Sequence, residues 1–430
     1  MKNICFYFEI HQPFRLKRYR FFEIGEDHYY YDDFQTEDYI RMLVEQAYLP
    51  ATRIIAEMIR SSNGKFKCAF SISGVAIEQL EQFAPELIDE FKLLAKTGSV
   101  EFLAEPYSHS LSSVYDTNEF ERQVKLHSAK MEELFGKKPT TLRNAELIYS
   151  DEIGEVVSKM GYKTMLVEGT KNVMGWKSPN CVYNHPYTKL KLLVRNNKLS
   201  DDISFRFSDH TWTDFPLTAE KYINWISNIP DSEPVVNIWV GYEALGYYQR
   251  AESGIFDFFK ALPYHAMENG INFTLPSEIT KKTESTDSIS STYPTSWSGS
   301  KDLSVWNGND LQQEALNKLY AVSERVQLCN DKPLLHDWLF LQTTDHFRYM
   351  SHNDTFGSYY VSPYEAFINY MNILADFLDR VEAHYPSTID NEELNALLKT
   401  INNQEKEIAQ LEEELKKARS RKNKQEEKPQ

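Results

Sequence analysis

The 430-residue chain has little cysteine, and its four cysteines stand far apart in the sequence. No Cys-x-x-Cys pair is present, so the sequence contains neither a redox site of that type nor a cysteine ligand set for zinc. Phosphate loops, GxGxxG loops, His-Glu-x-x-His motifs and GxSxG elbows are absent as well. These absences argue against a hydrolase that needs a metal ion, and we expect the cysteines to be reduced.

Positive charge is also scarce, because 47 Lys and Arg face 63 Asp and Glu, which gives a formal net charge of −16. Nucleic acids and acidic membrane surfaces are held mainly by basic residues, so we expect neither as a partner. No apolar run approaches the roughly 18 residues of a membrane span. Glu9 and His11 interrupt the apolar N-terminus, which therefore predicts a buried strand rather than a signal segment. The expected compartment is cytoplasmic.

Short apolar runs alternate with longer segments of helical periodicity over the first 280 residues. This alternation is typical of an α/β protein whose strands run parallel. The expected strands are Ile4–Ile10, Cys68–Ile72, Val100–Ala104, Thr141–Arg143, Thr164–Val167, Lys191–Val194 and Val235–Val240. The expected helices include Thr36–Arg60, Glu86–Thr97, Asn118–Phe135 and Asp151–Met160. About seven such strands predict a barrel, and we assign residues 1–280 to it.

A change in composition marks the end of this region. Residues 281–302 are rich in Ser and Thr and poor in aliphatic side chains, as expected of a surface linker. Helical periodicity returns in Asp310–Cys329 and Pro363–His384. The sequence therefore predicts that a helical domain, residues 303–388, follows the barrel and completes its groove.

Residues 389–430 form a tail with a heptad pattern. The seam consists of Leu394, Leu397, Ile401, Gln404, Ile408, Leu411, Leu415 and Ala418. A seam of this length with charged flanks favours a coiled-coil helix, and the polar Gln404 would fix its register or its number of partners. We expect a homo-oligomer held together by this tail. A solvated helix docked on its own domain is the alternative.

Polar side chains follow several of the expected strands, and the loops after the strands build the binding site of a barrel. His11 and Gln12 follow the first strand, where a lone His is often structural. Glu105 and His109 follow the third, where dense polar groups are costly to bury unless they pair or bind something.

Two later strands end in residues suited to sugar chemistry. Glu146 follows one of them, and Arg143 would keep it ionised, as a nucleophile requires, although a plain salt bridge is the alternative. Trp239 begins an aromatic-rich segment whose rings suit the apolar faces of sugars, although aromatic residues mostly build cores. Asp345 and His346 follow in the helical region, where an ordinary buried Asp–His hydrogen bond is the alternative.

In this order and spacing, the motifs resemble those of glycoside hydrolase family 57, in its α-amylase branch. The resembling segments are His11-Gln12-Pro13, Gly98–Leu111, Arg143–Tyr149, Trp239–Gln249 and Leu303–Tyr320. The resemblance extends from residue 1 to about residue 385. It implies a distorted (β/α)7 barrel with a helical domain, and retaining cleavage of α-1,4-glucans without a cofactor.

The resemblance also implies the roles of single residues. Glu146 takes the place of the catalytic nucleophile. The implied substrate-binding residues are His11, Gln12, Glu105, His109, Trp239, Tyr242, Trp306, Asp345 and His346. One position departs from the pattern, because Gly241 stands where the family carries its general acid/base Asp.

This departure predicts an impaired site. Retaining hydrolysis uses two carboxyl groups about 5–5.5 Å apart, and glycine supplies none. Loss of a positioned acid lowers the rate by about 10²–10⁴. Glu243 is the candidate substitute, but in an extended strand it would be displaced by about 6–7 Å from position 241. The leading hypothesis is therefore an α-glucan-binding protein with weak or no hydrolysis.

Two other hypotheses remain. The first is an active α-amylase that uses Glu146 as nucleophile and Glu243 as acid. The second is an assembly or regulatory protein of glucan metabolism in which the coiled coil is the functional part.

Overall fold

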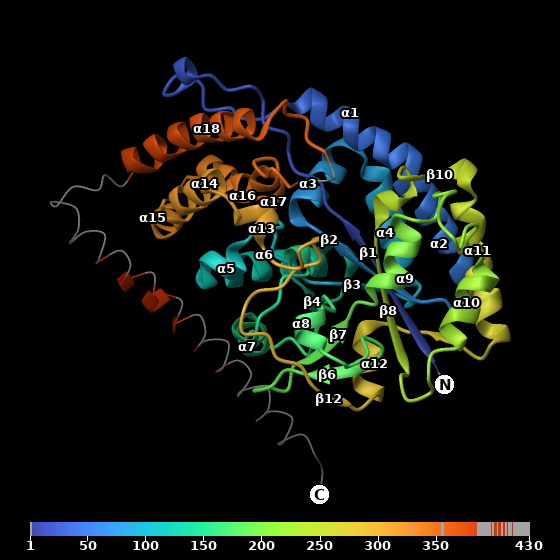
Figure 1. The fold of residues 1–430 in the computed structure, drawn as a ribbon. Helices are drawn as coiled ribbons and strands as arrows, with labels where there is room; N and C mark the ends of the chain where they lie inside the picture. The colour runs from blue at the N-terminus through green and yellow to red at the C-terminus, as the bar shows by residue number, and fades with distance from the viewer. Residues whose placement is uncertain are drawn as a thin grey trace, which may run out of the picture.

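The structure is a computed structural model that describes residues 2–329, 331–353 and 357–384, and the positions 397, 400, 401, 403–405, 407, 408, 411 and 415. Strands fill the centre of the molecule, and helices surround them (Figure 1).

Among the described residues, seven strands run parallel in two groups. The first group has the order β8 (Val235–Gly241), β1 (Asn3–Ile10), β2 (Cys68–Ile72) and β3 (Val100–Phe102). The second group has the order β4 (Thr141–Arg143), β5 (Thr164–Val167) and β7 (Lys191–Val194). Isolated parallel bridges join Ala104 to Leu142 and Arg195 to Asn237. The two groups are therefore linked at both edges.

Each sheet also has short additional strands. β11 (Asn272–Phe273) pairs with the start of β1. β6 (Val182–Asn184) runs antiparallel to β7, and β12 (Asp287–Ser288) pairs with β6. The fold is thus α/β with mixed sheets.

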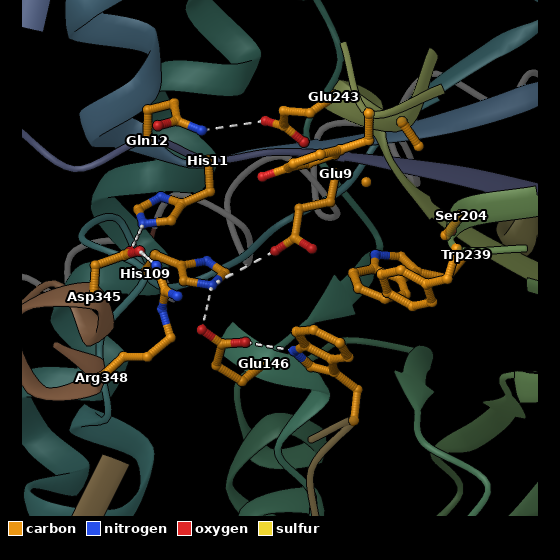
Figure 2. A pocket seen from close by; sticks show the side chains of 15 residues that line it. Glu9, His11, Gln12, His109, Glu146, Ser204, Trp239, Glu243, Asp345 and Arg348 are labelled. Carbon is orange, nitrogen blue, oxygen red and sulfur yellow. Dashed lines mark hydrogen bonds and ion pairs between the residues drawn. The ribbon is translucent and has the colours of Figure 1, made fainter. Parts of the chain in front are cut away.

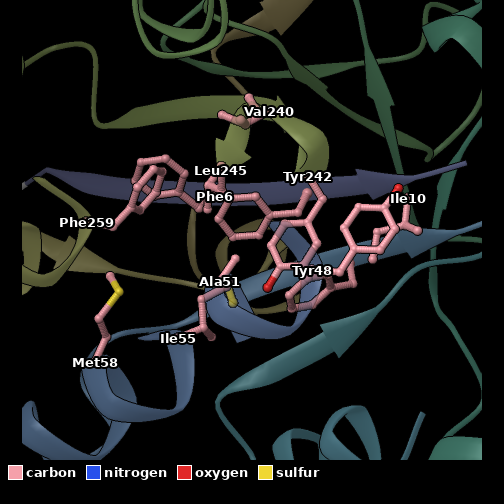
Figure 3. Packing of buried hydrophobic residues seen from close by; sticks show 14 of the residues in the cluster. Phe6, Ile10, Tyr48, Ala51, Ile55, Met58, Val240, Tyr242, Leu245 and Phe259 are labelled. Carbon is pink, nitrogen blue, oxygen red and sulfur yellow. The ribbon is translucent and has the colours of Figure 1, made fainter. Parts of the chain in front are cut away.

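Alternate residues of β1 face two different clusters, because successive side chains of a strand point to opposite faces. Phe6 and Ile10 belong to one hydrophobic cluster with residues of α2 (Leu49–Ser61) and α11 (Ile255–Glu268), in which the ring centroids of Phe6 and Phe259 lie 6.0 Å apart (Figure 3). Tyr7 points the other way and packs with residues of the remaining strands, including Leu193 and Trp239. Both faces of the strand are buried, which explains its nearly continuous apolar sequence.

The expected strands Cys68–Ile72, Thr141–Arg143, Thr164–Val167 and Lys191–Val194 are confirmed with the same bounds. The expected helix Thr36–Arg60 is interrupted: α1 (Asp33–Leu43) and α2 are separated by a π-helical turn, Val44–Tyr48. The antiparallel strand β6 was not expected. Its three residues are too few to show a period in the sequence.

Other helices lie between the strands and cover them. They are α3 (Gly74–Phe83), α4 (Pro85–Lys96), α5 (Ser112–Tyr115), α6 (Thr117–Phe135), α7 (Asp151–Lys159), α8 (Lys171–Met174), α9 (Asn197–Ser204), α10 (Ala219–Ser227) and α12 (Pro276–Lys282).

The helices after residue 303 share one hydrophobic cluster with the second group of strands. Trp338 and Phe377 belong to the same cluster as Leu142 and Met165. The helices are α13 (Ser304–Asn307), α14 (Asp310–Tyr320), α15 (Ser323–Leu328), α16 (Lys332–Leu341), α17 (Thr344–Arg348) and α18 (Pro363–His384). The expected helix Asp310–Cys329 is therefore two helices, whereas Pro363–His384 is confirmed.

The expected coiled coil lies mostly outside the described residues. Five described seam residues are in helical conformation, and their side chains are 43–58% exposed: Leu397, Ile401, Ile408, Leu411 and Leu415. In the part of the chain that the structure describes, no helix has the length and apolar character needed to span a membrane.

Candidate active site

A cavity of about 180 Å³ lies at the carboxyl ends of β1, β4 and β8 (Figure 2). It brings together eight of the twelve residues singled out in the sequence. These are His11, Gln12, His109, Glu146, Trp239, Gly241, Glu243 and Asp345. The ladder of parallel strands explains their meeting, because it brings the strand ends to the same edge.

Glu146 is presented by a strained turn directly after β4. Its φ angle is 54° and that of Leu147 is 53°, in the left-handed region that non-glycine residues rarely occupy. Trp297 Nε1 donates a hydrogen bond to Glu146 Oε2 at 2.5 Å, and Thr344 Oγ1 donates one to Oε1 at 3.0 Å. Burial raises the pKa of Glu146, but His109 and Trp297 outweigh it, so the pKa lies below its ordinary value. An ionised carboxylate is the form that a nucleophile requires.

His109 is the cation at the centre of the cavity. Its Nδ1 lies 3.0 Å from Glu105 Oε2, and its Nε2 lies 3.5 Å from both Glu9 Oε1 and Glu146 Oε1. Burial lowers the pKa of His109, but the surrounding carboxylates raise it to about 10. The imidazole is therefore protonated at neutral pH, and its ring stacks on His11 with 4.0 Å between the centroids.

Arg143 pairs with carboxylates other than the one expected. Its Nη1 lies 2.7 Å from Glu9 Oε1 and 3.8 Å from Glu105 Oε2, and the guanidinium group is fully buried. The expectation that Arg143 keeps Glu146 ionised is thus corrected, because His109 makes that contact. Burial raises the pKa of Glu9 against the opposing charge of Arg143.

Gly241 ends β8 in an ordinary extended conformation, with φ −60° and ψ 131°. The backbone would therefore accept any side chain. A Cβ atom at this position would have one neighbouring atom within 4 Å among the described residues, Glu243 Oε2 at 3.3 Å. The missing side chain leaves open space on the cavity side of the strand.

Glu243 does not continue β8 as an extended residue. The chain turns into a short 3-10 helix, Tyr242–Ala244, which folds the Glu243 carboxylate back toward position 241. The expected displacement along an extended strand is therefore corrected. Tyr48 and Gln12 donate hydrogen bonds to Glu243 Oε1. Burial nevertheless raises the pKa of Glu243 to about 7.

Asp345 of α17 brings the helical region to the cavity. His11 Nε2 lies 2.9 Å from Asp345 Oδ2, and Arg348 donates to Oδ1 at 3.0 Å. Although burial opposes it, these two partners keep the pKa of Asp345 well below its ordinary value. Asp345 is not bonded to His346, whose Nε2 lies 3.1 Å from the carbonyl oxygen of Phe340.

Four of the singled-out residues are buried behind the cavity and do not line it: Glu105, Tyr242, Trp306 and His346. This corrects the expectation that each of them lies where a substrate would touch it. Glu105 instead supports His109, and Tyr242 meets Thr52 in the core with 2.9 Å between their hydroxyl oxygens.

Several cavity residues were missed from the sequence. Glu9, Trp297 and Arg348 contribute charge or hydrogen bonds, and Phe205 contributes a ring, whereas Tyr248 belongs to the aromatic segment Trp239–Gln249 that was expected to contact sugars. The period of β1 is a signal for Glu9, because it stands two residues before His11 and faces the same side. Trp297 lies in the segment expected to be a surface linker, and no local pattern marks it. No group of His, Cys, Asp and Glu among the described residues is arranged to hold a metal ion.

The chain matches the family model for glycosyl hydrolase family 57 over residues 5–291. It is 34% identical over 401 residues to a protein of Methanocaldococcus jannaschii described as "Putative alpha-amylase", covering 87% of this chain and 84% of that protein.

Solved structures share the fold. The branching enzyme of family 57 from Thermococcus kodakaraensis superposes with a TM-score of 0.66 at 12% identity, covering 89% of this chain and 94% of that chain. The alpha-amylase AmyC from Thermotoga maritima superposes with a TM-score of 0.59 at 13% identity, covering 93% and 96%.

Proposed function

The chain belongs to glycosyl hydrolase family 57, and from this premise we propose that it binds α-1,4-glucan in the cavity and hydrolyses it weakly. The observation that carries the proposal is the pairing of an ionised Glu146 with an open position at Gly241. One half of a retaining site is present, and the other lacks its carboxyl group.

The cavity walls support the binding of sugar rings. The rings of Trp239 and Trp297 meet with 5.1 Å between their centroids, and Phe205 and Tyr248 also line the cavity. Aromatic faces of this kind suit the apolar faces of sugars.

We also propose that the parallel strands form a distorted (β/α)7 barrel over residues 1–280. The support is the cyclic strand order, in which two bridges connect the two groups of strands. Residues 303–388 would be the helical domain that completes the groove. Asp345, which reaches the cavity from α17, supports this division. The segment 281–302 would then be more than a linker, since Trp297 holds Glu146.

In this proposal Glu146 is the nucleophile. Its carboxylate attacks the anomeric carbon, and a proton must reach the leaving oxygen at the same time. Because Gly241 provides no proton donor, cleavage of a sugar leaving group is slow by about 10²–10⁴.

The test separates the nucleophile from the acid. α-Maltosyl fluoride needs almost no acid assistance, whereas maltoheptaose needs it, so both are given to the wild type, Glu146→Gln and Gly241→Asp. We expect fluoride release by the wild type and its loss in Glu146→Gln. Gly241→Asp should raise maltoheptaose hydrolysis by about 10²-fold. No fluoride release by any variant, with no heat of binding for maltoheptaose, would refute the proposal.

A second candidate function is an active α-amylase in which Glu243 is the acid. The turn after β8 favours it, because it places Glu243 Oε2 close to the position of a Cβ at residue 241. A pKa of about 7 would leave a large fraction of Glu243 protonated at neutral pH. This candidate requires normal maltoheptaose turnover that is lost in Glu243→Gln.

A third candidate is an assembly or regulatory protein of glucan metabolism, with the coiled coil as the functional part. The exposed helical residues Leu397, Ile401, Ile408, Leu411 and Leu415 support it. It would be favoured if deletion of residues 389–430 changed assembly while maltoheptaose binding was undetectable.

A further inference from the structure

We propose that Glu9 is the proton donor for the residual hydrolysis, in the place where Gly241 leaves no acid. The proposal rests on the proposed function, because it requires that α-glucan is cleaved through Glu146. Glu9 lines the cavity, and its side chain is 13% exposed, so a substrate oxygen can reach it.

The first support is the strand register. Glu9 on β1 is the direct partner of Gly241 on β8. Neighbouring strands lie about 4.8 Å apart, and paired residues of parallel strands project to the same side. Glu9 therefore stands next to the position of the missing side chain, with one more methylene than an Asp would have. Among the described residues, the one atom within 4 Å of a Cβ built at Gly241 is Glu243 Oε2 at 3.3 Å.

The second support is the distance to the nucleophile. Glu9 Oε1 and Glu146 Oε1 each lie 3.5 Å from His109 Nε2, so these two oxygens are at most 7.0 Å apart. This upper bound admits the spacing of a retaining site, about 5–5.5 Å. Figure 2 shows the Glu9 carboxylate beside His109, whose ring also contacts Glu146.

The third support is the count of charges around the cavity. Three cationic groups, Arg143, His109 and Arg348, face five carboxyl groups: Glu9, Glu105, Glu146, Glu243 and Asp345. Unpaired charges are costly to bury, so this excess of carboxyl groups favours protonation of those whose charge is least compensated. The pKa directions agree, because burial raises the pKa of Glu9 and of Glu243. The pKa values of Glu105, Glu146 and Asp345 are lowered despite burial, because positively charged partners contact them.

The chemistry balances with one water molecule. Glu146 forms a bond to the anomeric carbon as the glycosidic C–O bond breaks, and the proton of Glu9 passes to the leaving oxygen. Glu9, now a carboxylate, then takes a proton from water while the water oxygen displaces Glu146 from the anomeric carbon. Both carboxyl groups return to their starting states.

The position of Arg143 explains why this activity would be weak. Its Nη1 is 2.7 Å from Glu9 Oε1 and favours the ionised carboxylate. The charge of His109 also disfavours the protonated form of Glu9, whereas the charges of Glu105 and Glu146 favour it. These cationic contacts limit the protonation of Glu9, and its protonation increases as the pH falls.

The experiment compares Glu9→Gln with Glu101→Gln on the full chain. Glu101 is a matched control, because burial also raises its pKa and it lies outside the cavity on β3. Fluoride release in the first turnover of α-maltosyl fluoride measures glycosyl transfer to Glu146 without acid assistance. Hydrolysis of maltoheptaose measures the same step with a leaving group that needs an acid. Hydrolysis of 4-nitrophenyl α-maltoside measures it with a leaving group that needs an acid much less.

We expect Glu9→Gln to lower maltoheptaose hydrolysis by about 10- to 100-fold and to leave first-turnover fluoride release within about threefold. Azide, which needs no general base, should speed the later turnovers of Glu9→Gln, and Glu101→Gln should match the wild type. Equal loss on all substrates would assign Glu9 a structural role and overturn the proposal. The proposal would also be overturned if Glu9→Gln hydrolysed maltoheptaose as fast as the wild type, or if only Glu243→Gln lost this activity. It would be overturned as well by a wild type that releases fluoride but cleaves neither maltoheptaose nor 4-nitrophenyl α-maltoside. Failure of the wild type to release fluoride would refute the proposed function itself.

Discussion

Single side chains decide which carboxyl groups of the cavity are ionised. Glu146 and Glu243 are both buried glutamates, yet the pKa of Glu146 is below its ordinary value and that of Glu243 is about 7. The difference is the charge of their partners. Glu146 faces the protonated His109, whereas Glu243 is held by the neutral donors Tyr48 and Gln12. Environment, rather than residue type, therefore sets the different pKa values of these two glutamates.

Trp297→Phe tests this arrangement at the residue scale. The substitution keeps the ring and removes the N–H that donates to Glu146 Oε2. A hydrogen bond to a charged group is worth about 1.5–3 kcal/mol, so the pKa of Glu146 should rise by about one unit or more. The acid limb of the pH profile for α-maltosyl fluoride should move to higher pH by the same amount.

The control for this prediction is Trp225→Phe on α10, which makes the same change outside the cavity. An acid limb that stays in place in Trp297→Phe would contradict the assigned role of the indole.

At the scale of elements, short turns that follow the strands position the cavity carboxylates. β4 is followed by the 3-10 turn that carries Glu146, and β8 is followed by the 3-10 turn that carries Glu243. The N-terminal segment that enters α1 is held by α18, which is distant in sequence but lies beside it (Figure 1). Asp376 of α18 is fully buried and accepts hydrogen bonds from the backbone N–H of Gly25 and from the Tyr30 hydroxyl, and it pairs with His28.

Asp376→Asn should loosen this attachment. The change removes charge-assisted hydrogen bonds, and we expect the free energy of unfolding to fall by about 2 kcal/mol at pH 7. Although burial raises it, the pKa of Asp376 in the folded chain is lowered by its partners. The stabilisation is therefore present above the ordinary pKa of 3.8 and is lost as the pH falls through the folded value. Urea unfolding of the wild type and of Asp376→Asn should show a smaller difference in the free energy of unfolding below about pH 4 than at pH 7.

Asp379→Asn provides the comparison for this prediction, because Asp379 lies on the same helix and is exposed. Equal losses of stability in the two variants would show that the buried contacts of Asp376 carry no special weight.

At the scale of the whole molecule, the site is assembled from segments that are far apart in the sequence. His11 meets Asp345 at 2.9 Å, and Glu146 accepts a hydrogen bond from Thr344. The helical region after residue 303 therefore forms one wall of the cavity, and the two linked groups of strands form the others.

The C-terminal tail bears on the assembly of the whole molecule. If residues 389–430 form a coiled coil between copies, a chain that ends at residue 388 should be a monomer, whereas the full chain should be an oligomer. Light scattering at micromolar concentration measures this directly. Fluoride release per chain should be the same in both, because the cavity lies outside the tail.

A point variant sharpens this prediction. Leu411→Glu puts a charge on the seam and should dissociate the oligomer, whereas Glu407→Lys changes an exposed position beside it and should not. A full chain that is monomeric would contradict the coiled coil and leave the solvated helix.

The sequence by itself determined the α/β class and the identity of most elements. Four central strands have the expected bounds, because an apolar run between turn residues is a local property of the chain. The ends of these strands also identified eight residues of the cavity. Local pattern did not reveal the π-helical break in Thr36–Arg60 or the pairing of β6, which depend on packing against distant segments.

Only the tertiary structure decided which groups touch. Arg143 was expected to hold Glu146, but the strand register brings Glu9 to it instead, and His109 takes the place beside Glu146. Trp297 reaches Glu146 from a segment with no sequence signal at all. Periodicity predicts which face of a strand a side chain occupies. The distances between strands and the desolvation of charges depend on how the whole chain folds. The protonation of this cavity therefore follows from the fold.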